Sequence, residues 1–392
     1  MQYNFDKVTH RKGTNSIKYD YVSDIFGTDD IIPMWVADMD FEVPPEVSNA
    51  IQERARHTIY GYSVKPDRFN ESVQSWLKNR HDWEVEADWL SFVPGVVPTL
   101  ALAVLSLTEP GDQIIIQSPV YFPFYNVIKG NHRKLLNNQL IYKNGSYHID
   151  FDHLESLIDD KTKMLLLCSP HNPVGRVWSK EELLKLGEIC LKHNITIVSD
   201  EIHQDIVYEP YKHIPTASLS EELAQITITA VAPSKTFNLA GLAASVAIIP
   251  NKKIKHKFDR ILNSLHLNLG NAFGTIALQE AYFNGAEWLD ELLGYLKNNY
   301  RFIKETIHKE MPRIKVVEPE ATFLLWLDFR DYQFSDKELK EFMINKAKIA
   351  MNDGPMFGPG GEGFQRMNFG TQRSRIESAL ANLQKALKQK AD

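Results

Sequence analysis

Lys235 is a lysine that the sequence surrounds with apolar and small residues. In the stretch "AVAPSKTFNLAGLAAS" (230–245), a hydrophobic run precedes Lys235 and a turn containing Gly241 follows it. Apolar surroundings disfavour the charged form of a lysine, and a lysine with a lowered pKa is a better nucleophile or base. The pattern therefore marks Lys235 as a candidate for covalent chemistry.

Two more polar side chains stand in equivalent places, each after a short hydrophobic run. Asp200 follows "ITIVS", and Asn172 lies two residues beyond "MLLLCSP". Taken alone, Asp200 is as well explained by a helix N-cap, and Asn172 by a turn before Pro173. In an open α/β sheet, however, ligands bind beyond the carboxyl ends of the strands. We therefore expect Asn172, Asp200 and Lys235 to meet in one crevice.

The elements that must position these residues form an alternating pattern. Short apolar runs predict buried strands at 113–119, 164–170, 195–201, 226–234 and 245–250. Between them lie helical patterns such as 179–194, which begins with a serine N-cap. Strands that alternate with helices predict an α/β fold with a mainly parallel sheet covered on both faces.

Other segments offer weaker candidates. "PGVVPTLALAVLSL" (94–107) is a glycine turn that opens an apolar helix, a place where backbone N–H groups bind phosphate. Tyr121 is by default a core aromatic. His203 has no second ligand at a zinc-like spacing, so no metal site is expected. "GPGGEG" (358–363) lacks the lysine of a phosphate loop, and we interpret it as a tight turn that presents Arg366.

Length and composition set the broad class. With 392 residues and 43% hydrophobic residues, the chain is long enough for two or three domains. We place a large α/β domain at 51–285 and a smaller α+β domain at 286–392, with residues 1–50 packing on the smaller one. The smaller domain should contain a long amphipathic helix ended by Pro312 and a C-terminal helix from residue 373 to 390.

The bulk properties also exclude several partners. A formal charge of -6 and the absence of a basic patch argue against nucleic acid as the main partner. The sequence has neither a signal-peptide h-region nor an apolar run of membrane-spanning length. Two cysteines fit a reducing compartment. We therefore expect a cytoplasmic protein that binds no membrane.

Together these segments resemble the fold-type I pyridoxal-phosphate enzymes, the aspartate aminotransferase superfamily, over nearly the whole chain. Within it the sequence is similar to the cystathionine β-lyase and C–S lyase branch, which also contains a maltose-regulon modulator. The stretches that carry this second resemblance are "MWVADMDFEVPPEV" (34–47), "YGY" (60–62), "SPHNPVGRVW" (169–178), "SDEIHQDIVY" (199–208), "APSKTFNLAGL" (232–242) and "GEGFQRMNFGT" (361–371).

The resemblance implies a cofactor, pyridoxal 5'-phosphate, in the large domain. Lys235 would hold it covalently, Asp200 would pair with its ring nitrogen, Asn172 would bind its phenolic oxygen, and Tyr121 would stack on the ring. The remaining cofactor contacts implied are backbone N–H groups of Val96 and Val97 and the side chain of Ser234 at the phosphate, and His203 at the ring edge.

The resemblance also implies an amino-acid substrate and a homodimer with shared active sites. Arg366 would bind the substrate carboxylate, Ala37 would lie in the segment that covers the substrate, and Tyr62 would reach the phosphate of the neighbouring subunit. Two positions depart from aspartate aminotransferases: His203 replaces a tyrosine, and Ala243 replaces an arginine that would bind the phosphate. Both departures favour the lyase branch.

Three functions follow from the resemblance. The leading one is β-elimination from cystathionine or a related cysteine S-conjugate, which yields a thiol, pyruvate and ammonia. The second is an aminotransferase, which uses the same lysine and aspartate. The third is a cofactor-bound regulatory protein, against which the complete catalytic set argues.

Overall fold

A central, mainly parallel sheet organises the larger part of the molecule in the computed structural model, which describes residues 3–391. The strand order is β2-β10-β9-β8-β7-β3-β4. The strands are β2 (Leu90–Val93), β3 (Gln113–Ile116), β4 (Lys134–Asn137), β7 (Thr162–Cys168), β8 (Thr196–Asp200), β9 (Thr227–Val231) and β10 (Ser245–Ile248). Of these seven described strands, β10 runs opposite in direction to the other six. The five predicted strands are confirmed, and β2 and β4 extend the sheet at its two edges.

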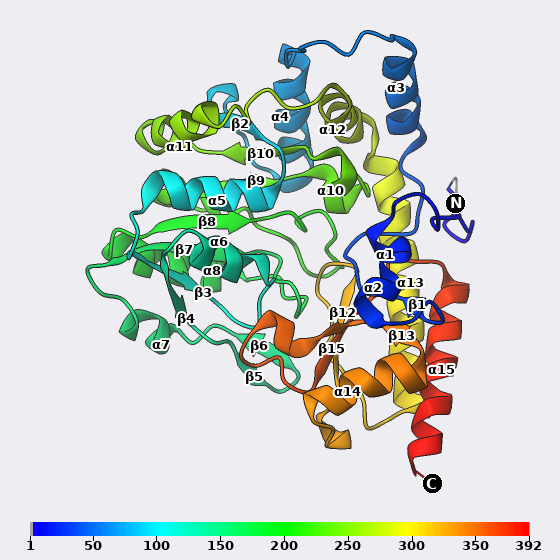
Figure 1. Ribbon diagram of the computed structural model, residues 1–392. Helices are drawn as coiled ribbons and strands as arrows, with labels where there is room; N and C mark the ends of the chain where they lie inside the picture. The colour runs from blue at the N-terminus through cyan, green and yellow to red at the C-terminus, as the bar shows by residue number, and fades with distance from the viewer. Residues whose placement is uncertain (1–2, 392) are drawn as a thin grey trace.

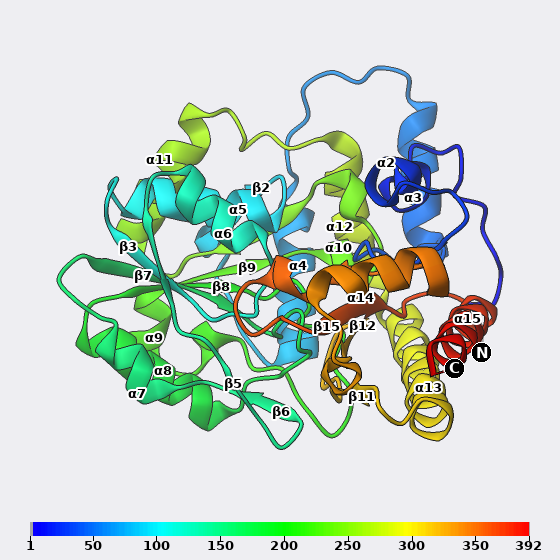
Figure 2. The same ribbon diagram turned by 60° about the horizontal axis from the view of Figure 1, so that its bottom comes forward.

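Helices cover both faces of this sheet, as Figure 2 shows. One face carries α5 (Val96–Leu107), α6 (Pro123–Gly130) and α11 (Lys252–Ser264), and the other carries α7 (Phe151–Ser156), α8 (Lys180–Lys192) and α9 (Glu221–Ile226). Helix α8 begins with a capping box between Ser179 and Glu182, a device that stabilises a helix by about 1 kcal/mol. The predicted α/β fold class is therefore confirmed.

A second, antiparallel sheet lies beside the long helix α13 (Ala286–Glu310) (Figure 1). Its strands, in spatial order, are β11 (Lys315–Val316), β12 (Leu324–Asp328), β15 (Phe364–Asn368) and β14 (Asn352–Asp353). The neighbouring helices are α14 (Asp336–Phe342) and α15 (Arg373–Ala391), and α12 (Ala272–Asn284) precedes α13 in the chain. Helix α13 ends just before Pro312, as predicted. None of the described helices is long and apolar enough to cross a membrane.

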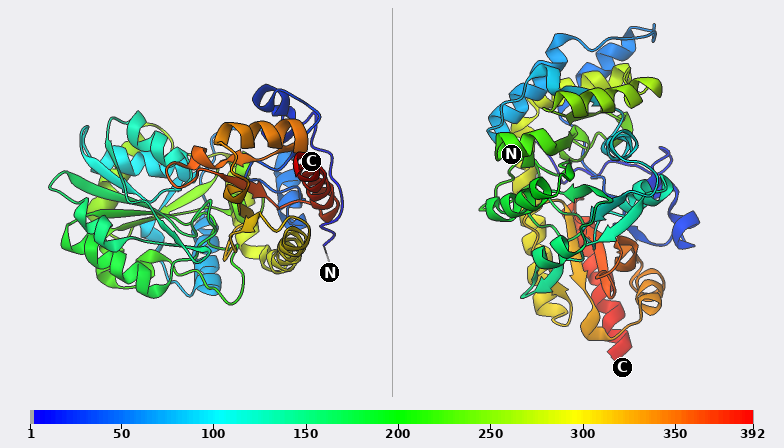
Figure 3. Two further views of the ribbon diagram at one scale, coloured as in Figure 1. Left: turned by 90° about the horizontal axis from the view of Figure 1, so that it is seen from below. Right: turned by 90° about the vertical axis from the view of Figure 1, so that its left-hand side faces the viewer.

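The first residues of the chain pack on this second sheet and α13. Their elements are α1 (Ile17–Asp20), α2 (Val22–Phe26) and β1 (Ile32–Pro33). Helices α3 (Pro45–Arg56) and α4 (Asp67–His81) follow and pack instead against α12. Strand β1 pairs in parallel with β13 (Ile349–Ala350). The ring of Phe5 lies 5.6 Å from that of Trp288 on α13. In the left view of Figure 3 the start of the chain passes the C-terminal helix α15. The domain boundaries near residues 50 and 285 stay a prediction.

The register of the central sheet aligns the ends of three neighbouring strands. Cys168 at the end of β7 pairs with Asp200 at the end of β8, and Asp200 pairs with Ala230 on β9. Because these strands are parallel, their carboxyl ends lie at one edge. The residues that follow them, Asn172 and Lys235, are therefore delivered to the same edge as Asp200.

Candidate active site

A cavity of about 200 Å³ opens at this edge of the sheet. Nine predicted site residues line it: Ala37, Val96, Val97, Tyr121, Asn172, Asp200, His203, Ser234 and Lys235. They come from six separate stretches of sequence, and the fold brings them together. Arg366 lies directly behind Asn172, while Tyr62 lies elsewhere.

Lys235 lies on the short helix α10 (Pro233–Thr236), which follows β9 directly. Its Nζ donates a hydrogen bond to the carbonyl oxygen of Ala37 at 2.6 Å. Burial lowers the pKa of Lys235 to about 8, and the nearby charge of Arg366 acts in the same direction. Asp38 and Asp200 oppose this shift. A sizeable fraction of this amine is therefore neutral near physiological pH, as a nucleophile or base requires.

Asp200 is a buried carboxylate at the floor of the cavity. Its Oδ1 accepts a hydrogen bond from the backbone N–H of Ile202 at 3.2 Å. Burial raises the pKa of Asp200 to about 7. A carboxylate in this position is costly unless a cation lies against it. The protonated nitrogen of an aromatic ring would provide that charge, so Asp200 fits the cofactor that the sequence predicts.

His203 and Tyr121 line the same cavity from different elements. The Nδ1 of His203 is buried without a hydrogen-bond partner, and its ring meets Phe323 edge-on at 6.1 Å. Burial lowers the pKa of His203 well below its ordinary value, so the imidazole is neutral.

Among residues 3–391, no group of three or more His, Cys, Asp or Glu side chains is arranged to hold a metal ion.

Arg366 is a buried guanidinium whose recorded acceptors are neutral oxygens. Nη1 donates to Asn172 Oδ1 at 3.0 Å, and Nη2 donates to the Trp35 carbonyl at 3.0 Å and to Asn352 Oδ1 at 2.6 Å. Its Nε is buried without a partner. Burial lowers the pKa of Arg366 to about 10. A guanidinium in this state is ready to bind a carboxylate, which it recognises through two parallel hydrogen bonds.

The presentation of Arg366 differs from the prediction. A tight turn does precede it, with Gly361 N bonded to Gly358 O at 3.1 Å. Arg366 itself, however, is the central residue of β15, where it pairs with Trp326 and Asn352 on the neighbouring strands. A sheet therefore fixes this side chain, and the turn only leads into the strand.

The start of α5 forms a suitable cradle for a phosphate. Gly95 has φ +127°, and a Cβ there would lie 3.3 Å from Pro98 Cδ, so a glycine suits this turn. The N–H groups of Val96 and Val97 stand in the first turn of α5, where a helix offers them no internal acceptor. Ser234 adds a hydroxyl to the same cavity. Ala243 lines the same cavity and adds no charge there, so this end of the cavity offers a phosphate hydrogen-bond donors and no guanidinium.

Tyr62 does not reach this cavity within its own chain. Its side chain is fully exposed, and it lines a separate hollow with residues 266–273. Its role at the phosphate of a neighbouring subunit stays a prediction.

Some site residues were not identified from the sequence. The Trp35 carbonyl and Asn352 hold Arg366, and Cys168 lines the cavity, where its Sγ accepts from Asn172 N at 3.4 Å. A main-chain oxygen and an asparagine on a two-residue strand leave no signal in a sequence. Cys168 has the small apolar side chain of an ordinary core residue, so its type alone does not mark a site.

His171, next to Asn172, makes the stability of the fold depend on pH. Its ring is buried, with Nε2 2.9 Å from the carbonyl oxygen of Pro119. Burial lowers the pKa of His171 to about 4. Between pH 6.5 and 4 the unfolded chain therefore binds a proton that the folded chain does not bind, and stability falls as the pH falls.

We expect this residue to remove about 2–3 kcal/mol from the free energy of unfolding between pH 7 and pH 4.5. Urea unfolding of wild type and His171→Asn at both pH values measures the effect. The variant should lose correspondingly less stability on acidification. Equal losses in the two proteins would show that His171 is not the group responsible.

Comparison with known proteins adds independent findings. The profile of the family "Aminotransferase class I and II" matches residues 29–383. Cystathionine beta-lyase PatB of Bacillus subtilis is 46% identical over 385 residues, which cover 98% of this chain and 100% of the relative.

Two solved structures are similar along their whole length. Cystalysin from Treponema denticola, which contains pyridoxal 5'-phosphate, is 40% identical with a TM-score of 0.96, covering 99% of this chain and 100% of that chain. The pyridoxal-phosphate-bound C–S lyase from Staphylococcus hominis is 33% identical with a TM-score of 0.91, covering 99% and 98%.

Proposed function

The chain belongs to the class I and II aminotransferase family, and we propose that within this family it is a pyridoxal-phosphate-dependent C–S β-lyase. Its substrate would be cystathionine or a related cysteine S-conjugate, and its products a thiol, pyruvate and ammonia. The observation that carries the proposal is the pair of buried charges around Lys235. Asp200 and Arg366 stand in and behind one cavity without an ion-pair partner among the described side chains, so the site calls for a ligand with a cationic ring and a carboxylate.

The residues of the cavity fit pyridoxal 5'-phosphate. When bound, this cofactor supplies an electron sink for the negative charge that develops at the substrate's α-carbon. Lys235 would hold it covalently, and Asp200 would keep a proton on its ring nitrogen. Asn172 uses its carbonyl oxygen for Arg366, which leaves its amide group as a donor to the phenolic oxygen. The N–H groups of α5 and the Ser234 hydroxyl would hold the phosphate.

The remaining groups act on the substrate. Arg366 would bind the α-carboxylate and fix the orientation of the α-carbon. The amine of Lys235, with its pKa of about 8, is suited to remove the α-proton near neutral pH. Loss of that proton allows the bond from the β-carbon to sulfur to break, and the thiolate leaves.

A single assay separates elimination from transamination. Elimination needs one substrate, whereas an aminotransferase needs a 2-oxo acid to complete its cycle. We expect purified protein to release pyruvate and free thiol from L-cystathionine continuously with no oxo acid added. If turnover occurs only with a 2-oxo acid and the thiol stays bonded to carbon, the protein is an aminotransferase. If neither product forms under either condition, the regulatory interpretation gains support.

We also propose that the active form is a homodimer in which Tyr62 of the partner subunit completes the phosphate site. Exposed apolar side chains gather beside Tyr62, on two loops that Lys65 links by a hydrogen bond to Asn268 O at 2.6 Å. They are Ile59, Tyr60, Val64, Leu265 and Leu269. An exposed apolar patch of this kind is typical of an interface. A cytoplasmic location, consistent with two buried free cysteines, is part of the same proposal.

Removal of the Tyr62 hydroxyl should weaken cofactor binding. Sedimentation should give about twice the 45.0 kDa chain mass. Tyr62→Phe should lower the affinity for pyridoxal phosphate about tenfold, the value of one hydrogen bond to a charged group. Tyr211→Phe, an exposed tyrosine outside the cavity, is the matched control. A fully active monomer would exclude both the dimer and the role of Tyr62.

A further inference from the structure

Residues 36–41, here termed the covering segment, lie over Lys235 without helix or strand structure. The carbonyl of Ala37 in this segment accepts the hydrogen bond from Lys235 Nζ at 2.6 Å. An irregular segment in this position has no ladder of backbone hydrogen bonds to fix it. Its few backbone hydrogen bonds run from Asp40 N to Gly370 O and from Asp38 N to Val36 O, each at 2.9 Å. Side chains of other elements supply further contacts to its backbone.

Two asparagines hold the backbone of the covering segment. Asn238, three residues after Lys235, accepts from Met39 N at 2.9 Å and donates to Met39 O at 2.9 Å. Asn368, two residues after Arg366, donates to Asp38 O at 2.6 Å. The chain segments that carry Lys235 and Arg366 thus also hold the covering segment.

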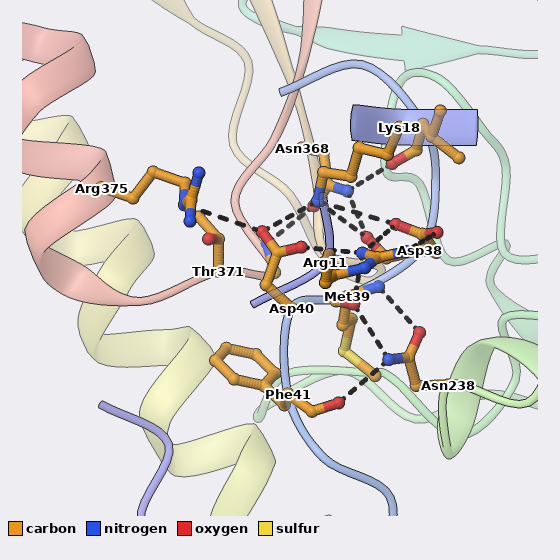
Figure 4. Close-up of polar contacts among 12 residues, drawn as sticks. Arg11, Lys18, Asp38, Met39, Asp40, Phe41, Asn238, Asn368, Thr371 and Arg375 are labelled. Carbon is orange, nitrogen blue, oxygen red and sulfur yellow. Dashed lines mark hydrogen bonds and ion pairs between the residues drawn. The ribbon is translucent and has the colours of Figure 1, made fainter. Parts of the chain in front are cut away.

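A buried ion cluster centred on Asp40 adds a further restraint (Figure 4). Oδ1 of Asp40 lies 2.8 Å from Arg11 Nη1, and Oδ2 lies 3.0 Å from Nζ of the fully buried Lys18. Arg375 approaches Oδ2 at 4.0 Å. Arg11 also contacts Asp38 through both of its terminal nitrogens, at 2.9 and 2.6 Å. Three basic side chains, those of Arg11, Lys18 and Arg375, therefore converge on the carboxylate of Asp40.

Stability alone is a weak explanation for this cluster. The desolvation energy of several buried charges offsets much of their mutual attraction. Apolar residues can therefore often replace buried ion clusters without loss of stability. Burial raises the pKa of Asp40, but Lys18, Thr371 and Arg11 outweigh this effect, so that the net pKa lies below its ordinary value. Asp40 is thus anionic at neutral pH, and its ion pairs with Arg11 and Lys18 fix the direction of its side chain.

We propose that Asp40 is a positioning residue, whose carboxylate fixes the covering segment so that the Ala37 carbonyl orients the amine of Lys235. Arg11 and Lys18 bind Asp40 from the N-terminal arm (residues 11–18). Because Asp40 lies only three residues after Ala37, fixing Asp40 also limits the movement of Ala37. The expected effect on kcat rests on the proposed function, whereas the expected effect on the covering segment does not.

The test is Asp40→Asn in the cofactor-loaded enzyme, with Glu42→Gln as the matched control. Asparagine keeps the shape of Asp40 but loses its charge, whereas Glu42 is exposed and pairs only with Lys7 and Thr9 among its recorded contacts. Hydrogen exchange of the amides of residues 36–41, followed by mass spectrometry, should be about tenfold faster in Asp40→Asn and unchanged in the control.

The kinetic constants should separate positioning from binding. With L-cystathionine, kcat of Asp40→Asn should fall about tenfold or more, because a displaced lysine transfers the α-proton poorly. KM should change less than about threefold, because Asn172 and Asn352 still hold Arg366. Both constants are measured at a temperature where a melting curve shows the variant to be folded.

Three outcomes decide the proposal. A lowered melting temperature with wild-type exchange in residues 36–41 and wild-type kcat would overturn it, since Asp40 would then only stabilise the fold. If Asp40→Asn does not fold, Arg11→Gln replaces it, and about threefold effects in the same directions are expected. Wild-type values in that variant overturn the proposal. If the wild type releases no pyruvate, the proposed function fails, while amide exchange still tests the positioning.

Discussion

Replacing Lys235 by alanine is expected to reduce kcat for pyruvate release by a factor of about 10⁴ or more, because one side chain supplies both the covalent attachment and the base. The lysine is half-buried and hydrogen-bonded to Ala37 O, and no other lysine lines the described cavity. The measurement is kcat with L-cystathionine at saturating cofactor. Lys255→Ala, which removes a lysine paired with Asp259 on α11, is the control and should retain activity.

The attachment site has its own readout. Borohydride treatment of the wild type should fix the cofactor to the chain, and mass spectrometry should locate the added mass on the peptide that contains Lys235. The alanine variant should carry no such adduct, even where it still binds the cofactor. An adduct on a different lysine of the wild type would refute the assignment regardless of the kinetic result.

The course of the central sheet could be predicted because its strands are buried runs of apolar residues. β7, β8 and β9 lie between helices on both faces, so their hydrophobicity is continuous and easily recognised. β4 was missed because it lies at an edge, where its residues are partly exposed and no apolar run forms. β2 was missed because Ser91 interrupts the short apolar run of its four residues, LSFV.

The candidate site was predictable to the extent that it depends on the sheet. Asn172, Asp200 and Lys235 follow strand ends, and the topology alone delivers them to one edge. The N-cap alternative for Asp200 fails, since a turn and not a helix follows β8, although its Oδ1 does accept from Ile202 N. The roles of these residues at a cofactor came from the resemblance, and they stay predictions.

The contacts that depend on packing between distant segments could not be predicted. The Asp40 cluster joins the N-terminal arm to α15, and Asn352 reaches Arg366 across a strand pair. No local pattern records such contacts, since each partner is an ordinary charged or polar residue in its own segment. The role predicted for Tyr62 would involve a second chain, which the fold of one chain does not define.

Asp200→Ala should lower kcat by about 10² to 10³, equivalent to about 3–4 kcal/mol, because a buried charge at a reacting centre stabilises the transition state strongly. Without the carboxylate, nothing in the described cavity has the charge to keep a proton on a ring nitrogen. KM should change little, since Arg366 is untouched. The measurement is steady-state kinetics on protein whose cofactor content is shown by absorbance to match that of wild type.

Asp200→Asn is the informative comparison, because it separates the charge of Asp200 from its hydrogen bond to Ile202. Asparagine retains an oxygen that accepts from Ile202 N and preserves the turn, but it carries no charge. If the charge matters, the asparagine variant should lose nearly as much kcat as the alanine variant while keeping wild-type stability. If asparagine restores kcat to within a few-fold of wild type, Asp200 serves the turn after β8 and the proposed electrostatic role is wrong.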